Sequence, residues 1–69
     1  MLKKRSFNIA GHKTSIALEP EFWTVLERYA KEKGISLSAL VAELDKARGL
    51  RPLASTLRVH ALAAAARTA

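Results

Sequence analysis

Residues 13–44 read KTSIALEPEFWTVLERYAKEKGISLSALVAEL, and this stretch decides the fold. The side chains of residues 13–18 alternate in polarity with a period of two, which predicts a short β-strand. Pro20 then stands at the start of a helical pattern, where its missing backbone N–H costs nothing. Apolar residues spaced by three and four predict a helix over residues 21–33: Phe22, Val25, Leu26, Tyr29 and Ala30.

A second helix is predicted directly after the first. Gly34 suits the left-handed position that ends a helix, and Ser36 is a good N-cap for the next one. Only Gly34 and Ile35 separate the two patterns, so the helices are expected to form a tight pair. Gly49 ends the second helix, whose apolar stripe is Leu37, Leu40, Val41, Leu44 and Ala47.

Residues 1–12 are predicted to form either a basic N-terminal arm or the outer strand of a hairpin. Glycine suits the first central position of a type II′ hairpin turn, which favours a turn at Gly11-His12. That register pairs Ile9 with Thr14 across the two strands. It also collects five side chains on one face of the hairpin: Phe7, Ile9, Thr14, Ile16 and Leu18.

A third helix is expected over about residues 54–67, within a C-terminal extension that comprises residues 49–69. Its apolar stripe is weaker than those of the first two helices. Residues 50–69 are nevertheless apolar enough to contact a protein partner or to enlarge a dimer interface. Residues 13–48 between the arm and this extension form the expected core unit.

The chain has 69 residues, a mass of 7.5 kDa and no cysteine. A monomer of this size buries only roughly 60% of its unfolded surface, so its own core is marginal. Small domains compensate with disulfides, a metal or a partner subunit. No disulfide is available, and His12 and His60 have no metal-ligand spacing, so neither a metal nor a cofactor is expected. Oligomerisation is therefore the remaining way to stabilise so small a core.

The net charge of +6 is concentrated at the two ends of the chain. Residues 1–13 carry four bases and no acid, residues 14–48 carry five bases and six acids, and residues 49–69 carry three arginines. A basic arm on a neutral body favours a polyanion such as nucleic acid, although charge also serves solubility. No secretory signal or membrane-spanning stretch is visible, so we expect a cytoplasmic protein.

No arrangement of residues typical of catalysis is visible. The six acids are scattered, and Glu43 and Asp45 fall on different sides of the predicted helix. There is no Ser-His-Asp or Cys-His set and no glycine-rich phosphate loop. The sequence therefore predicts a binding protein and not an enzyme.

The order of strand, helix, tight glycine turn and helix resembles the ribbon-helix-helix family of DNA-binding proteins, the fold of the Arc and methionine repressors. The longer pattern KRSFNIAGHKTSIALEPEFW, GISLSALVAELD and RGLRPLASTLRV is similar to a bacterial subgroup with an N-terminal extension and an extra C-terminal helix. The resemblance implies a mostly α fold with a short β-ribbon, in which two chains intertwine as a homodimer. The implied dimer core is Ile16, Leu18, Phe22, Leu26, Leu37, Leu40, Val41 and Leu44.

That resemblance also implies a way of binding double-stranded DNA. The paired strands would enter the major groove, with Lys13, Ser15 and Ala17 as the candidate base-reading residues. Phosphates would meet the start of the second helix and the basic arm. The candidate phosphate contacts are Ser36, Leu37, Ser38, Lys3, Lys4 and Arg5.

Two further expectations follow from treating the chain as such a dimer. A lone protomer would expose Ile16, Leu18 and the stripe from Leu37 to Leu44, so folding and dimerisation are expected to be one event. A paired outer strand would give the dimer four strands, which exceeds the two-stranded ribbon that a major groove accepts. The alternatives to a transcriptional regulator are the antitoxin of a toxin–antitoxin pair and a dimeric protein-interaction module without specific DNA reading.

Overall fold

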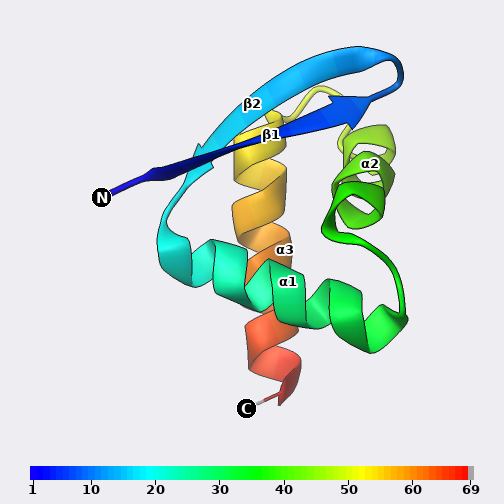
Figure 1. The fold of residues 1–69 in the computed structure, drawn as a ribbon. Coiled ribbons are helices and arrows are strands. Elements are labelled where there is room, and N and C mark those ends of the chain that lie inside the picture. Colours follow the sequence, from blue (N-terminus) through cyan, green and yellow to red (C-terminus); the bar gives the residue numbers. More distant parts are fainter. Residues whose placement is uncertain (69) are drawn as a thin grey trace.

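The chain begins with a β-hairpin that crosses above the ends of the second and third helices, while the first helix runs lengthwise below it (Figure 1). The computed structural model describes residues 1–68, so Ala69, the end of the expected C-terminal extension, lies outside the described residues. The order of elements confirms the predicted ribbon followed by two helices and a third C-terminal helix. The elements are β1 (Lys3–Ile9), β2 (His12–Leu18), α1 (Pro20–Lys33), α2 (Leu37–Ala47) and α3 (Leu53–Thr68).

The turn of the hairpin lies one residue earlier than the sequence predicts. Ala10 and Gly11 occupy it, with φ of 52° and 81°, and the strands pair Ile9 with His12 and Phe7 with Thr14. Positive φ at both central residues is the type I′ geometry, so the expected type II′ turn at Gly11-His12 and its pairing of Ile9 with Thr14 are wrong. The backbone twist of a type I′ turn matches the right-handed twist of the strands, although Ala10, unlike a glycine, is strained at positive φ.

The predicted faces of the hairpin are nevertheless correct. The new register differs from the expected one by two residues, which preserves the side of the sheet on which each side chain lies. Thr14 is half-buried on the side that faces the helices. The other four members of the predicted apolar face are buried: Phe7, Ile9, Ile16 and Leu18.

The two central helices begin and end where the sequence predicts. Pro20 opens α1, and Gly34 ends it with φ of 72°, its amide donating to the carbonyl of Lys31 at 3.0 Å. Ser36 caps α2, because its hydroxyl accepts a hydrogen bond from the amide of Ala39 at 3.0 Å. The short connection folds α2 back against α1, and the buried residues of both helices join one core with the hairpin and α3.

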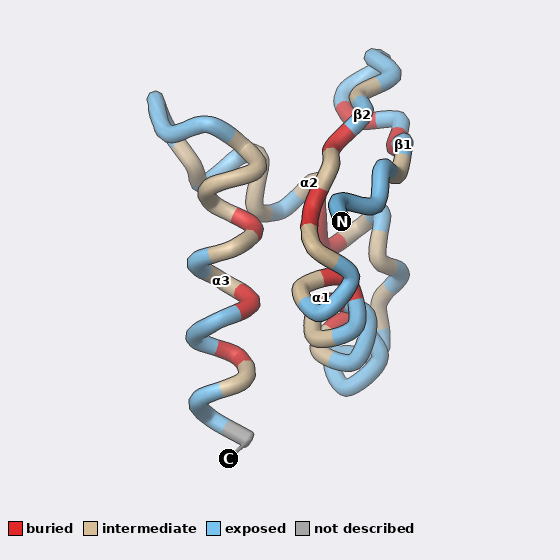
Figure 2. Tube along the Cα trace, turned by 90° about the vertical axis from the view of Figure 1, so that its left-hand side faces the viewer, coloured by how far each residue is buried: buried red, intermediate tan, exposed pale blue. Residues whose placement is uncertain are grey.

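Helix α3 closes the core within the single chain (Figure 2). One side of α3 is buried against α1, α2 and β2, with Leu57, Ala61 and Ala64 as its buried residues. Arg58 Nε also donates to Glu19 Oε1 at 3.1 Å, which ties α3 to the junction between β2 and α1. This bond and, more strongly, a hydrogen bond with the backbone of Glu19 lower the pKa of that carboxyl.

The closed core corrects the expectation that a lone protomer exposes its apolar stripes. Ile16, Leu18, Leu40 and Val41 are all buried inside one chain. Residues of the expected dimer core that remain partly exposed are Phe22, Leu37 and Leu44. The chain therefore covers with α3 most of the surface that was expected to require a partner.

Two leucines of α3 test this packing as a matched pair. Leu57 is fully buried, whereas 67% of the surface of Leu62 is exposed. Leu57→Ala should lower the free energy of unfolding by about 2–5 kcal/mol, because it removes buried atoms and leaves a cavity. Leu62→Ala should change it by less than about 0.5 kcal/mol. Urea titrations of both variants measure the difference; equal effects would contradict this orientation of α3.

The hairpin turn can be tested through Ala10. Asn-Gly is the preferred dipeptide of a type I′ turn, so Ala10→Asn should raise the free energy of unfolding by about 1 kcal/mol by relieving the left-handed strain. Thermal melts of this variant and of the wild type give the comparison. In a turn at Gly11-His12, residue 10 would be a strand residue, where asparagine is unfavourable. A loss of stability in Ala10→Asn would therefore favour the rejected register.

Candidate nucleic-acid interface

The hairpin presents a polar row of side chains to solvent on the side away from the helices. Cross-strand pairing places Asn8 opposite Lys13 and Ser6 opposite Ser15. These four residues are exposed, and so is Lys4, which pairs with the half-buried Ala17. The structure thus brings the three candidate base-reading residues together with Lys4 on one surface. That surface contains two lysines and no acid.

The hydroxyls of Ser6 and Ser15 lie 3.0 Å apart and form a hydrogen bond across the strands. Ser15 therefore has a partner in its own chain before any ligand arrives. A base edge would compete with Ser6 for this hydroxyl, which weakens the contribution of Ser15 to base recognition. Among the described residues of the row, the lysines keep their full capacity to donate.

An indole ring attaches β1 to the helices. Trp23 is buried, and its Nε1 donates to the carbonyl oxygen of Lys3 at 2.8 Å. The ring of Phe7 packs against the same indole, with ring centroids 5.8 Å apart. Helix α1 therefore holds β1 both by a backbone hydrogen bond and by aromatic contact.

Arg5 adds to this attachment and faces the helices instead of the outer surface. Its guanidinium lies 5.5 Å from the centroid of the Trp23 ring, and its Nη1 is 3.4 Å from Glu27 Oε2. Both contacts come from α1, so Arg5 is half-buried between the strand and the helix. Of the three basic residues of β1, Lys3 and Arg5 share the helix-facing parity, and Lys4 alone belongs to the outer row.

The start of α2 is a separate place on the molecule. The hairpin crosses the top of Figure 1, and α2 begins below it. The hydroxyl of Ser36 is already used as the helix cap. The amides of Leu37 and Ser38 have no hydrogen-bond partner within residues 1–68, so they remain available to an anion. The structure therefore leaves these two groups of candidate residues, the outer row and the start of α2, on different elements.

One edge of β2 is unpaired. In an antiparallel hairpin closed by a two-residue turn, the pair beside the turn is hydrogen-bonded, and such pairs alternate along the strands. The pair of Ile9 with His12 begins this alternation. The backbone amides and carbonyls of Lys13, Ser15 and Ala17 consequently point away from β1. In the part of the chain that the structure describes, the sheet contains only β1 and β2, so this edge has no neighbouring strand.

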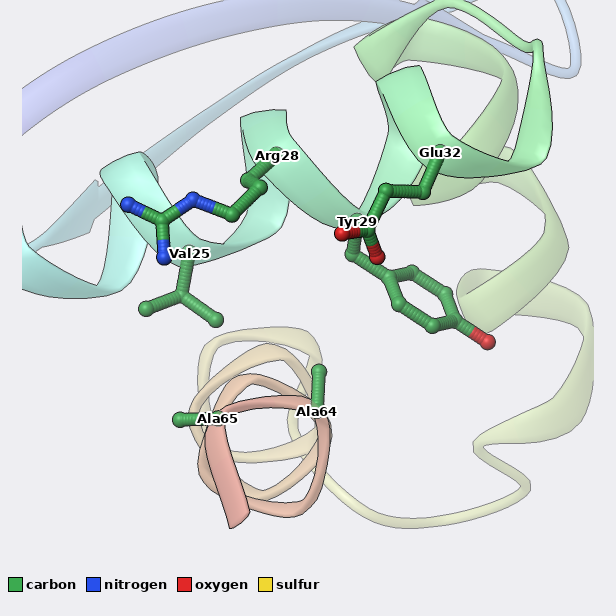
Figure 3. Close-up of a pocket in the computed structure, with 6 residues that line it drawn as sticks. All are labelled: Val25, Arg28, Tyr29, Glu32, Ala64 and Ala65. Carbon is green, nitrogen blue, oxygen red and sulfur yellow. The ribbon is translucent and has the colours of Figure 1, made fainter. Parts of the chain in front are cut away.

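The described residues show no pocket of ligand size, no metal cluster and no membrane-spanning helix. The best pocket, between α1 and α3, has a volume of about 40 Å³, whereas ligand sites in proteins measure roughly 300–1,000 Å³ (Figure 3). Residues 1–68 contain no cluster of three or more side chains suited to a metal ion. Within the same residues, every helix is too short or too polar to cross a bilayer.

His60 contacts Tyr29, one of the residues that line this pocket, and its role is in packing. Its ring packs edge-on against Tyr29, with ring centroids 4.9 Å apart, and its Nε2 is buried without a hydrogen-bond partner among the described residues. Burial lowers the pKa of His60, and the positive charges of Arg67 and Lys33 lower it further. These effects favour the neutral form of the imidazole, which packs between α1 and α3.

The comparison with protein families agrees with this geometry. The model of a ribbon-helix-helix domain matches residues 2–65, which is nearly the whole chain. The chain therefore belongs to the ribbon-helix-helix family, a family of DNA-binding regulators. No curated protein and no solved structure matches it significantly.

Sequence reasoning left two members of the outer row out of the candidate site. Ser6 and Asn8 share the parity of Lys4, and the alternation of the strand already placed them on the outer face. The alternation of residues 6–10 would therefore have identified Ser6 and Asn8, provided that this segment is taken as a strand. No sequence pattern indicates that Trp23 donates to the carbonyl of Lys3, because a backbone acceptor leaves no trace in residue identity.

The attachment of β1 can be tested at Trp23. Trp23→Phe keeps an aromatic ring beside Phe7 but removes the Nε1 donor to Lys3, so it should cost about 1–3 kcal/mol of unfolding free energy. The loss should appear as faster hydrogen exchange of the β1 amides. Lys3→Ala is the matched control, because it keeps the acceptor carbonyl. Unchanged exchange in β1 of Trp23→Phe would show that the indole does not hold the strand.

Proposed function

We propose that the protein is a homodimeric transcriptional regulator that binds double-stranded DNA in the bacterial cytoplasm. Two copies pair their β2 strands antiparallel, the sheet so formed lies across the major groove, and the N-termini of the two α2 helices contact phosphates. Membership of the ribbon-helix-helix family and the acid-free outer row of the hairpin support this proposal.

The observation that best supports dimerisation is the unpaired edge of β2. An exposed row of backbone N–H and C=O groups is a template for pairing with another chain. Antiparallel pairing centred on Ser15 would place Lys13 of each copy opposite Ala17 of the other and use all outward groups of the edge. The edge of β1 is less suited to this pairing, because β1 carries three of the four Lys and Arg residues of the hairpin.

The exposed area of the single chain also supports a partner. The described chain has 4670 Å² of accessible surface, about a tenth more than the roughly 4,250 Å² expected for a compact monomer of its mass. Phe22, Leu37 and Leu44, which belong to the proposed dimer core, are among the apolar residues that the single chain leaves only partly buried.

In this dimer each outward side chain of β2 is able to contact a base in its own way. Lys13 donates to guanine O6 or N7, Ser15 donates or accepts with little discrimination, and Ala17 offers a methyl group to a thymine methyl. The amides of Leu37 and Ser38 donate hydrogen bonds to a phosphate at the positive end of α2. Base recognition therefore depends chiefly on Lys13.

A second candidate function is that of an antitoxin whose α3 contacts a toxin. The observation that favours it is the outer side of α3, where Val59 and Leu62 are 51% and 67% exposed. Val59 and Leu62 lie one helical turn apart, and exposed apolar side chains that gather into a patch mark a protein-contact surface. Leu50, fully exposed before α3, would extend that surface.

Binding to DNA decides between these functions. The protein should bind a duplex from the region upstream of its own reading frame at least about tenfold more tightly than a random duplex, since each lysine–guanine contact contributes about 1–3 kcal/mol. Fluorescence anisotropy at physiological salt measures both affinities, and sedimentation gives the dimer. Equal weak binding to both duplexes would contradict the proposed function as a transcriptional regulator. Tight binding to the product of a neighbouring frame, abolished by Leu62→Glu, would then favour the antitoxin.

A further inference from the structure

Strand β1 is an integral part of the core and not a detachable arm. Phe7 and Ile9 are only 8% and 6% exposed, and all seven residues of β1 are paired with β2. Trp23 and Glu27 of α1 hold the beginning of the strand through Lys3 and Arg5. Separation of β1 from β2 would expose two large apolar side chains and break the backbone pairing, so β1 stays in place when the protein binds a ligand.

The retained strand fixes the width of the sheet in the proposed dimer, on which this inference rests. Pairing of β2 with its copy gives four strands in the order β1, β2, β2 and β1. Adjacent strands lie about 4.8 Å apart, so each β1 axis lies about 7 Å from the twofold axis. The major groove is about 12 Å wide, so its edges lie about 6 Å from the same axis. Each β1 therefore lies over a sugar-phosphate backbone.

The outward side chains of β1 suit that position chemically. Lys4 provides an ammonium group, Ser6 a hydroxyl and Asn8 an amide N–H₂, and all three are exposed. When the Ser6 hydroxyl accepts its hydrogen bond from Ser15, its own proton is left to donate to a phosphate. Side chains of these types make most protein contacts to phosphate oxygens. The register places them beside the base-facing row of β2, on the same surface of the sheet.

We propose that the outward row of β1, formed by Lys4, Ser6 and Asn8, binds the phosphate backbone of double-stranded DNA at the two edges of the major groove. The sheet lies across the groove, with Lys13 reaching the base edges between the two rows. Affinity then comes mainly from the outer strands, and sequence preference comes from the inner ones.

The test compares Lys4→Ala and Asn8→Ala with Lys13→Ala, using Lys31→Ala as the matched control. Lys31 is an exposed lysine in the last turn of α1 and lies outside the sheet. Affinities are measured by anisotropy for the upstream duplex and for several unrelated duplexes at a series of salt concentrations. Circular dichroism confirms that each full-length variant is folded.

Lys4→Ala should weaken binding by the same factor on every duplex. It should also reduce the slope of log affinity against log salt by roughly 1.8, since a dimer loses two lysine–phosphate contacts of about 0.9 each. Asn8→Ala should weaken binding severalfold on every duplex with the slope unchanged, because an amide displaces no cation. Lys13→Ala should reduce the preference for the upstream duplex, and Lys31→Ala should match the wild type.

Three results would overturn the inference. If Lys4→Ala and Asn8→Ala bind like the wild type while Lys13→Ala is weakened, β1 does not contact DNA, and the proposed function survives without it. If Asn8→Ala changes the preference at one base pair instead of lowering all affinities, Asn8 reads a base and not the backbone. If the wild-type protein binds no duplex, the proposed function itself fails and the inference with it.

Discussion

The pairing of β1 along β2 is the constraint on which the rest of the structure depends. It places four apolar side chains of the hairpin against the helices: Phe7, Ile9, Ile16 and Leu18. The same pairing doubles the polar surface on the opposite side, because each outward residue of β2 gains a neighbour from β1. Trp23 strengthens the constraint by holding the beginning of β1 on α1. The core and the candidate interface are thus two faces of one hairpin.

The second constraint is that α3 completes the core in the same chain. A chain of 69 residues has too little interior of its own unless some element covers the open side of α1 and α2. Leu57, Ala61 and Ala64 provide that cover. Since the buried leucines need no partner, a dimer formed through the edge of β2 would associate folded protomers. Association and folding are then separate events with separate concentration dependence.

The sequence predicts those parts of this fold that depend on local chemistry. Gly34 and Ser36 mark the junction between α1 and α2, because a left-handed residue and a hydroxyl cap are both visible in residue type. The position of the hairpin turn is predicted one residue too late, since alanine at residue 10 gives no sign that it adopts a positive φ. The contacts of α3 and of Trp23 are also outside the reach of periodicity, because they join segments distant in the chain. Of the candidate site, the outward parity of Lys13, Ser15 and Ala17 follows from alternation, whereas the inward position of Arg5 depends on contacts with α1.

A second strand changes what a ribbon of this kind is able to recognise. A narrow two-stranded ribbon enters a groove deeply enough for short side chains to reach base edges. In the proposed dimer the wider sheet would rest on the groove edges, so a long side chain would reach the bases more easily than a short one. Lys13 is the single long side chain in the outward row of β2, and Ser15 is already bonded to Ser6. The pattern of one lysine between short neighbours is therefore consistent with a sheet that obtains its affinity from phosphates and its preference from very few bases.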